Sequence, residues 1–451
     1  MSTADMLDAI VIGGGIAGLA AAWDLRDRNV LVLEATDRVG GRIKSEPRGD
    51  IWLNFGAHVF SGAGSVSDRL LAETGIEAPT VGGRLAAVSL NGKLVASGGV
   101  ETFPFRLPMP LMSRVALVRA GLKLRLAVAQ YAKIAEPVPG EDPAVRQLRM
   151  LEFMDDRSFS AFSGRLPEDV DLLFRSTLTR SSGDPEQLPA GYGVGYFHLV
   201  WNRTAGLSRN ILGGPTRFIE ALALGLGDRI RRRALVTSVR QDADGVVVTW
   251  TADGVAHEAR AAAAVVATPA HITSQIVAGL PDDTAAALAA IPYGPYIVGA
   301  FLTGEQGPKP WDNLYALATP KRSFSMLFNM GNVLRGGETS RRPGGSLMAY
   351  AAAGFARRLW DVDDAAIEAR FREDFAALFP GTDPEVREVV IQRWERGVPH
   401  PVVGRSKLQA PLTRPLGRVH LAGDYLGSWY TETAVQTATL AAARIRTLIG
   451  G

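Results

Sequence analysis

The feature that most constrains this chain lies near its start, where an apolar run leads into closely spaced glycines. Ala9–Ile12 predicts a strand buried on both faces of a parallel sheet. Gly13, Gly15 and Gly18 follow in G-x-G-x-x-G spacing, and the alanine-rich run after them predicts a helix. In such a turn the first glycine allows the tight bend, the second lets a pyrophosphate approach the backbone, and the third lets the helix pack on the strand.

A second apolar run, Val30–Leu33, ends in Glu34 and then Ala35. An acid at the end of this second strand can accept hydrogen bonds from a ribose. At the start of the intervening helix, the backbone N–H groups around Ile16 and Ala17 and the helix dipole favour phosphate. Strand, glycine turn, helix, strand and acid in this order predict dinucleotide binding rather than a purely structural turn.

A glycine pair flanked by arginines comes directly after this acid. Arg38, Gly40, Gly41 and Arg42 form an R-x-G-G-R sequence. Paired glycines permit close approach of the backbone, and the donor forks of arginine suit phosphate oxygens. An isolated copy would indicate a surface turn with two solvated arginines, but its position after Glu34 favours cofactor binding.

Together these motifs resemble the superfamily of flavin-containing amine oxidases and protoporphyrinogen oxidases, which includes phytoene desaturase-like enzymes. Val265–Pro269 and His420–Asp424, the latter followed by a helical pattern, agree with the same resemblance. The resemblance implies FAD as the cofactor. It also implies an α/β fold, in which a Rossmann-like FAD-binding domain of the glutathione-reductase type is interleaved with an α+β substrate domain.

Length and composition agree with two such domains, because 451 residues exceed one typical domain and 47% hydrophobic content allows large cores. We expect the FAD-binding domain to combine residues 1–78, 211–290 and 390–451. We expect the substrate-binding domain to combine residues 79–210 and 291–389.

The resemblance also implies cofactor contacts beyond the opening unit. Gly56 and Ala57 offer a small surface for a flat ring, Val239 matches the position beside the adenine, and the helix after Asp424 can stabilise charge on a reduced flavin. The complete set of expected cofactor-binding residues is Gly13, Gly15, Ile16, Ala17, Gly18, Glu34, Ala35, Arg38, Gly40, Gly41, Arg42, Gly56, Ala57, His58, Val239, Ala267, Trp394, Gly423, Asp424, Thr431, Glu432 and Thr433.

Four residues are candidates for the catalytic pocket: Tyr430, His58, Trp394 and His400. Tyr430 lies where amine oxidases place one wall of an aromatic cage, and Trp394, Pro399 or His400 would supply the facing wall. For each histidine the alternative is a hydrogen-bonded structural residue. The six histidines show no metal-ligand spacing, so we expect no metal site.

The flavin supplies the difficult chemistry, because a hydride leaves a substrate C–H bond for the flavin N5 atom. We identify no acid–base dyad. Gly191–Trp201 mixes glycines with aromatic residues, which indicates either a pocket for a flat or apolar substrate or aromatic core filling beside a loop. We therefore expect an FAD-dependent oxidoreductase that dehydrogenates a largely apolar small molecule, with oxygen or another acceptor reoxidising the flavin.

Two other hypotheses stay open. An amine oxidase would produce an imine and hydrogen peroxide, but Val298 occupies the position where such enzymes commonly carry a lysine near flavin N5. Amino-acid oxidases usually place an arginine after the glycine–alanine step, whereas His58 and Val59 stand here. The third hypothesis is a non-redox flavoprotein, either an isomerase that uses reduced FAD or a protein that binds a lipid-like ligand.

Charge and hydropathy limit the partners. A net charge of +3 without a basic run interleaved with aromatic residues argues against nucleic acid. The lack of cysteine is typical of a cytoplasmic protein, and no apolar run reaches the roughly 20 residues of a membrane span. Residues 106–135 alternate apolar and basic side chains, which predicts either a helix resting on a membrane surface or one packing on its own domain. Nothing in the sequence specifies an oligomeric state.

Overall fold

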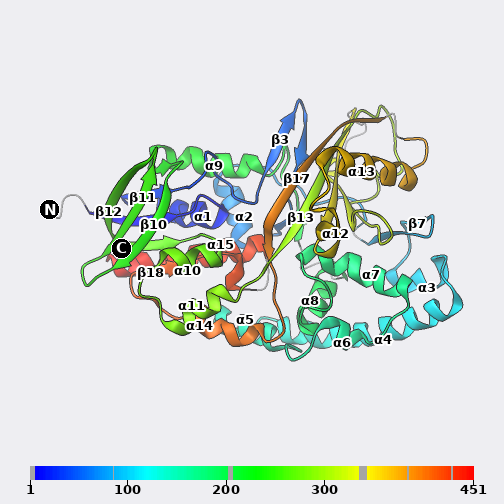
Figure 1. The fold of residues 1–451 in the computed structure, drawn as a ribbon, viewed down its shortest axis with the longest axis horizontal. Helices are drawn as coiled ribbons and strands as arrows, with labels where there is room; N and C mark the ends of the chain where they lie inside the picture. Colours follow the sequence, from blue (N-terminus) through cyan, green and yellow to red (C-terminus); the bar gives the residue numbers. More distant parts are fainter. Residues whose placement is uncertain are drawn as a thin grey trace.

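The structure is a computed structural model, and it contains two large sheets with helices around and between them (Figure 1). Only the backbone is described at residues 207, 208 and 430. The described residues are 6–84, 86–201, 207–334, 343–382, 385–427 and 430–450.

The first sheet contains the N-terminal glycine turn. Its strand order is β10-β11-β12-β1-β2-β9, and β18 also pairs with β12. The pairs β2–β1, β1–β12 and β12–β18 are parallel. The pairs β10–β11 and β11–β12 are antiparallel and form a meander. The strands are β1 (Leu7–Ile12), β2 (Val30–Leu33), β9 (Ile230–Arg231), β10 (Leu235–Gln241), β11 (Val246–Ala252), β12 (Val255–Val266) and β18 (Val419–Leu421).

Alanine-rich helices cover this sheet. α1 packs directly on α15, and Ala20, Ala21, Ala438 and Ala442 are buried in their shared core. Small side chains at these positions let the two helix backbones approach each other closely. The helices of this half are α1 (Ile16–Asp24), α2 (Val66–Glu73), α9 (Thr216–Leu226), α10 (Ala270–Ile276), α11 (Asp282–Ala289), α14 (Gln409–Thr413) and α15 (Tyr430–Leu448).

The second sheet is mostly antiparallel, with strand order β17-β13-β16-β15-β14-β6-β7. α12 (Gly354–Leu359) and α13 (Asp364–Leu378) pack on it, and Phe371 and Phe375 are fully buried in that layer. The strands are β6 (Ala87–Leu90), β7 (Lys93–Val95), β13 (Tyr293–Thr303), β14 (Ala316–Ala318), β15 (Met326–Asn329), β16 (Gly345–Ala352) and β17 (Val386–Pro399). Two small sheets, β3 (Ser45–Arg48) with β4 (Ile51–Asn54) and β5 (Phe60–Ser61) with β8 (Leu207–Arg209), lie outside both large sheets.

A group of helices lies beneath the second sheet in Figure 1. Gly191–Trp201 belongs to one of them, α8, so this stretch is a buried helix rather than a loop edge. Among the described residues no helix is both long and apolar enough to cross a membrane. The group consists of α3 (Phe103–Arg106), α4 (Leu111–Ala135), α5 (Pro143–Glu152), α6 (Phe159–Ser163), α7 (Glu168–Leu178) and α8 (Ala190–Trp201).

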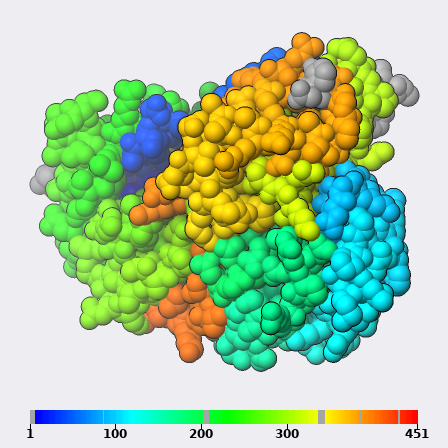
Figure 2. All heavy atoms as spheres, turned by 45° about the vertical axis from the view of Figure 1, so that its right-hand side comes forward, coloured from blue at the N-terminus to red at the C-terminus, as the bar shows by residue number. Residues whose placement is uncertain are grey.

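Each large sheet is assembled from separate stretches of the chain. The first takes strands from the three stretches expected for the FAD-binding domain, and Figure 2 shows N-terminal blue, green and orange segments side by side in this half. The expected boundary at residue 390 falls inside β17, which pairs with β13 from Val386 to Pro399. The division into two domains otherwise remains a prediction.

Candidate active site

The glycine turn leaves an open cradle at the start of α1. A Cβ atom built on Gly15 would meet no atom within 4 Å, and no side chain caps the helix that begins at Ile16. A Cβ on Gly18 would lie 1.8 Å from the carbonyl oxygen of Gly13, so strand and helix touch only because Gly18 has no side chain. Open space above unpaired helix N–H groups fits a pyrophosphate.

Glu34 stands at the end of β2 beside this cradle. Its Oε2 accepts a hydrogen bond from the backbone N–H of Gly14 at 2.7 Å. Its Oε1 accepts from the backbone N–H and the hydroxyl of Thr36, both at 2.8 Å. These bonds fix a carboxylate at the edge of the turn, where a ribose would accompany the pyrophosphate, and Ala35 is exposed beside it.

The R-x-G-G-R loop lies against the glycine turn. The backbone N–H of Gly40 donates to the carbonyl of Gly14 at 2.8 Å, and Gly41 lies next to Gly15. The guanidinium of Arg38 donates to backbone carbonyls of its own loop and lies 5.9 Å from the ring centroid of Trp394. The loop therefore connects the glycine turn to β17.

Arg42 and Asp424 form a two-pronged ion pair that joins distant parts of the sequence. Nη2 of Arg42 lies 2.9 Å from one carboxylate oxygen and Nη1 lies 2.7 Å from the other. Nη1 also donates to the carbonyl of Gly397 at 3.0 Å. Burial alone would lower the pKa of Arg42, but the charge and hydrogen bonds of Asp424 outweigh it and raise the pKa above its usual range.

The segment around Gly56 is held against Arg42 by its backbone. The N–H of Ala57 donates to the carbonyl of Arg42 at 3.1 Å, and a Cβ on Gly56 would lie 2.0 Å from that oxygen. Nε1 of Trp394 donates to the carbonyl of Phe55 at 2.8 Å. Gly56, Ala57, Arg42 and Trp394, which the sequence predicted to contact one cofactor, therefore lie together.

His58 continues from this segment as a neutral hydrogen-bond acceptor. Its Nδ1 lies 3.1 Å from the carbonyl of Gly56, so Nδ1 carries the proton. Nε2 is buried and has no hydrogen-bond partner among the described residues. Burial lowers the pKa of His58 to about 4, and the charge of Arg180 adds to the lowering. At neutral pH the ring is therefore uncharged, with Nε2 able to accept a hydrogen bond.

An aromatic wall runs from Trp394 to His58. Successive ring centroids along it are 6.0 Å apart between Trp394 and Tyr296, 5.2 Å between Tyr296 and Tyr350, 6.2 Å between Tyr350 and Phe328, and 5.0 Å between Phe328 and His58. The whole wall consists of Trp394, Tyr296, Tyr350, Phe328, His58 and Tyr315.

Arg180 is a functional candidate that the sequence analysis missed. Its guanidinium carbon lies 5.0 Å from the ring centroid of Phe328 in the aromatic wall and 5.5 Å from that of Tyr196. Within the described ranges its guanidinium makes no ion pair or hydrogen bond. No local motif marks this arginine, because its neighbours come from β15 and α8.

Arg180 also lines a cavity of about 290 Å³ beneath the second sheet. The cavity lies among α3, α4, α7, α8 and the strands β6, β14 and β15, and its lining is mainly apolar. Phe197 and Trp201 of α8 line it, so the aromatic side of that helix does face a pocket. Representative lining residues are Val88, Phe103, Leu117, Phe174 and Met326.

Comparison with known proteins agrees with this geometry. A sequence model described as flavin containing amine oxidoreductase matches residues 16–446. The chain belongs to the flavin-containing amine oxidoreductase family. FAD and the oxidoreductase class, both expected from the sequence, are therefore confirmed.

Curated relatives cover part of the chain. It is 28% identical over 257 residues to flavin-containing amine oxidase A of Sus scrofa, which covers 54% of this chain and 46% of that protein. It is 27% identical over 264 residues to a flavin-containing amine oxidase of Oncorhynchus mykiss, with 55% and 48% covered. The chain thus matches about half the length of these relatives.

Solved structures of the family share the fold. Putrescine oxidase bound to putrescine gives a TM-score of 0.76 at 19% identity, covering 98% of this chain and 99% of that one. Cyclohexylamine oxidase from Brevibacterium oxydans IH-35A gives 0.76 at 21% identity, covering 99% and 100%. The expected α/β flavin-binding fold is confirmed.

Other residues predicted from the family resemblance lie at the margins of this site. Val239 is buried in β10, where its carbonyl accepts from the N–H of Ala278 at 2.9 Å. The N–H of Ala267 donates to Ile12 at 2.8 Å, which places Ala267 against the glycine turn. The N–H of Gly423 donates to the hydroxyl of Thr437 on α15 at 3.0 Å. Contacts of these residues with FAD remain predictions.

A side chain in the first turn of α15 caps another helix, α2. The carboxylate of Glu432 accepts from the backbone N–H groups of Val66 and Ser67 at 2.9 and 3.3 Å, so it caps α2. Any contact of Glu432 with the cofactor therefore comes from its backbone. Thr431 and Thr433 are buried. The side chain of Tyr430 lies outside the described residues, and its role in an aromatic cage remains a prediction.

His400 lies apart from the aromatic wall. It lines a water-sized cavity of about 20 Å³ together with Asp424, Arg405 and Tyr425. Burial lowers the pKa of His400 to about 4, and neither ring nitrogen has a hydrogen-bond partner among the described residues. The structure thus brings His58 and Trp394 into one aromatic group and leaves His400 outside it.

Val298, which the sequence resemblance places where amine oxidases commonly carry a lysine, is fully buried in β13. It pairs with Tyr350 on one side and with Gln392 on the other. The Nζ of Lys44 donates to the amide oxygen of Gln392 at 2.9 Å. The ammonium group of Lys44 therefore contacts Gln392, the residue that pairs with Val298 in the sheet. No local sequence motif indicates this contact.

Proposed function

We propose that this chain is an FAD-dependent oxidoreductase that dehydrogenates a largely apolar small molecule held in the 290 Å³ cavity. The observation that carries the proposal is this cavity, whose lining includes Arg180. The guanidinium carbon of Arg180 lies 5.0 Å from the ring centroid of Phe328, which belongs to the aromatic wall. Ligand pockets of this size are lined mainly by apolar groups, with a few polar groups that fix orientation.

The chain's own residues bind and orient the substrate. When bound, FAD supplies the acceptor for two electrons and a hydrogen from a substrate C–H bond. The apolar lining excludes water from that bond. The neutral ring of His58 keeps its proton on Nδ1, so Nε2 is an uncharged hydrogen-bond acceptor in the aromatic wall, outside the lining of the cavity. No charged base is required in this arrangement.

A second candidate is an amine oxidase that produces an imine and hydrogen peroxide. The relatives named amine oxidases and the putrescine oxidase fold favour it. Val298 at the expected lysine position weighs against rapid reaction with oxygen. The cation at Arg180, which has no ion-pair partner among the described residues, repels a substrate ammonium group. We therefore rank it below the dehydrogenase.

Anaerobic mixing of the flavin-loaded protein with candidate substrates separates these functions. Three probe classes suffice: benzylamine, a porphyrinogen and a polyene. Loss of oxidised-flavin absorbance with an apolar probe supports the dehydrogenase. Fast loss with benzylamine, followed by peroxide release in air, supports the amine oxidase. Turnover only after chemical reduction of the flavin indicates an isomerase and contradicts the proposal.

Two cavity variants show whether the apolar cavity is the binding site. A side chain at Gly121 would extend into open space, since a Cβ there meets no atom within 4 Å and Gly121 lines the cavity. Gly121→Phe should therefore slow flavin reduction by an apolar probe at least tenfold, and Gly121→Ala should not. Equal rates in both variants would place the substrate elsewhere.

A further inference from the structure

We propose that Arg180 binds a carboxylate of the substrate at the inner end of the cavity, an inference that rests on the proposed function. The cavity has two different ends. Phe105, Leu122 and Arg125 line it and are exposed, which marks the outer opening. Arg180 lines it beside Phe328, on the side of the aromatic wall.

The charge of Arg180 is incompletely compensated. Its guanidinium is half-buried, and no described carboxylate lies within ion-pair distance of it. The rings of Phe328 and Tyr196 supply only a weak cation–π attraction. A cation partly removed from water is stabilised more strongly by a hydrogen-bonded anion. Arg42, which is also partly buried, has such a partner in Asp424.

The shape and chemistry of the cavity favour an apolar acid. A guanidinium fork binds both oxygens of a carboxylate in one plane. Val88, Leu117 and Met326 would contact the hydrocarbon part of the same molecule. Neutral and cationic ligands of equal size lack the ion pair.

Binding to the flavin-loaded protein tests the inference without turnover. The probes are octanoate, octanol and octylamine, which share a chain length and differ in the head group. Binding is followed by the change in flavin absorbance and, independently, by the shift in the thermal unfolding midpoint. We expect octanoate to bind at least tenfold more tightly than octanol, and octylamine to bind most weakly.

Two substitutions localise the effect. Arg180→Ala should weaken octanoate at least tenfold and leave octanol unchanged, whereas Arg180→Lys should retain part of the preference. Arg125→Ala is the matched control, because Arg125 also lines the cavity but lies at its exposed end. If Arg180→Ala does not fold, the relative affinities of the three probes for the unaltered protein still test whether the cavity prefers a carboxylate.

Equal affinity for octanoate and octanol would overturn the anchoring role of Arg180, as would equal losses for both ligands in Arg180→Ala. These failures differ from failure of the proposed function. If the protein binds octanoate at Arg180 but no apolar probe reduces its flavin, the result supports the role of Arg180 in carboxylate binding and contradicts the proposed dehydrogenase activity.

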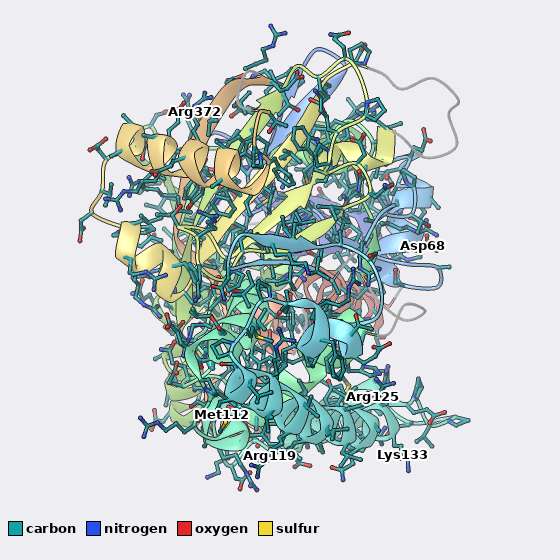
Figure 3. All side chains as sticks on the ribbon, turned by 90° about the vertical axis from the view of Figure 1, so that its right-hand side faces the viewer. Asp68, Met112, Arg119, Arg125, Lys133 and Arg372 are labelled. Carbon is teal, nitrogen blue, oxygen red and sulfur yellow. The ribbon has the colours of Figure 1, made fainter. Side chains whose placement is uncertain are left out.

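A separate observation concerns the outside of α3 and α4. We infer that a docking face, formed by Phe105, Leu111, Met112, Val115, Val118, Leu122, Leu126, Arg119, Arg125 and Lys133, binds an anionic lipid bilayer. Its apolar members are unusually exposed for large hydrophobic side chains: Phe105 is 76%, Leu122 61% and Leu126 70% exposed. Figure 3 shows Met112, Arg119 and Lys133 along the outer edge of the molecule on α4.

The positive charge of α4 favours an anionic partner for the docking face. α4 carries five basic residues and no acidic one over its 25 residues. Arg119, Arg125 and Lys133 are exposed and have no ion pair among the described residues. Each basic residue near an anionic lipid surface strengthens the binding of a protein to that surface. The opposite face of α4, which includes Leu117 and Leu124, is buried against the rest of the protein. In this proposal α4 therefore packs on its own domain with one face and rests on a membrane surface with the other.

The docking face also surrounds the opening of the cavity. Phe105, Val118 and Leu122 belong to both. A bilayer seated on this face would therefore lie against the entrance for an apolar molecule. This continuity favours a lipid surface over a protein partner.

Sedimentation with vesicles tests the docking face on the flavin-loaded protein. We expect it to sediment with vesicles of phosphatidylcholine and phosphatidylserine at low salt, and much less with phosphatidylcholine alone. Replacing Leu122 and Leu126 by glutamate should reduce sedimentation at least tenfold. Leu224→Glu is the matched control, because Leu224 is 85% exposed on α9. Absence of sedimentation with either vesicle, or burial of the face in a dimer seen by analytical ultracentrifugation, would overturn the inference.

Discussion

Single side chains hold the candidate cofactor site in place. Glu34 accepts three hydrogen bonds, one from Gly14 in the glycine turn and two from Thr36. We predict that the same carboxylate binds a ribose of the cofactor, and we therefore expect Glu34→Ala to weaken FAD binding. Hydrogen bonds to a charged group contribute about 1.5–3 kcal/mol, which corresponds to a loss of at least tenfold. The measurement is the flavin-to-protein ratio after gel filtration, with Glu34→Gln as the shape-matched control. Unchanged flavin content in both variants would contradict the ribose role.

The ion pair of Arg42 and Asp424 allows a second prediction. Its members are partly buried, with side chains 31% and 10% exposed. We expect each single substitution, Arg42→Met or Asp424→Asn, to lower the free energy of unfolding by about 1–3 kcal/mol, because it leaves a charge without its partner. The double variant should lose less than the sum of the two. Urea unfolding of the flavin-free protein gives this coupling energy, and strict additivity would contradict it.

The residues that sequence reasoning identified share one property. Gly13, Glu34 and Arg42 lie within one short stretch, where the order of strand, turn, helix and acid defines their roles. Arg180 and Lys44 have no such signal. Lys44 meets Gln392 across 348 positions of sequence, so only the assembled fold reveals the contact. Local motifs therefore predict the nucleotide end of the site, and tertiary packing determines the substrate end.

At the scale of elements, α8 combines close packing on one part of its surface with the lining of a cavity on another. Its glycines permit close packing: a Cβ on Gly191 would lie 1.5 Å from the carbonyl oxygen of Phe153. Its aromatic residues Phe197 and Trp201 line the cavity. The sequence could not separate the two, since a helix rich in glycine has low intrinsic propensity and is stable here through burial.

This packing predicts opposite effects of two glycine substitutions. Gly191→Ala should destabilise the protein by about 2 kcal/mol or more, because the new methyl group overlaps backbone atoms that cannot move independently. Gly121→Ala on α4 should stabilise it by up to about 1 kcal/mol, because alanine favours the helix and the position is open. Thermal unfolding of both variants measures the contrast, and similar midpoints would contradict it.

At the scale of the molecule, buried histidines make stability depend on acidity. Burial lowers the pKa of His58, His400 and His420 to about 4. In the unfolded chain their pKa lies near 6.5, so that state binds more protons as the pH falls between these values. Stability should therefore be greatest above about pH 6.5 and decline toward about pH 4, by up to roughly 3 kcal/mol per histidine.

Urea unfolding at a series of pH values checks this decline. His400→Gln should reduce the slope between about pH 6.5 and 4, since His400 is only 4% exposed and has no described hydrogen bond to lose. A variant with the same pH dependence as the unaltered protein would show that His400 is not responsible.

The pairing of Arg42 with Asp424 has a consequence for synthesis. β18 and Asp424 lie near the end of the chain, yet β18 completes the sheet beside β12 and Asp424 meets an arginine made 382 residues earlier. A polypeptide leaves the ribosome from its N-terminus, so the sheet that carries the glycine turn lacks β18, and Arg42 lacks its counter-charge, until residues 419–424 have emerged. Premature termination before β18 would therefore remove the nucleotide site, although every residue of its opening motif had already been made.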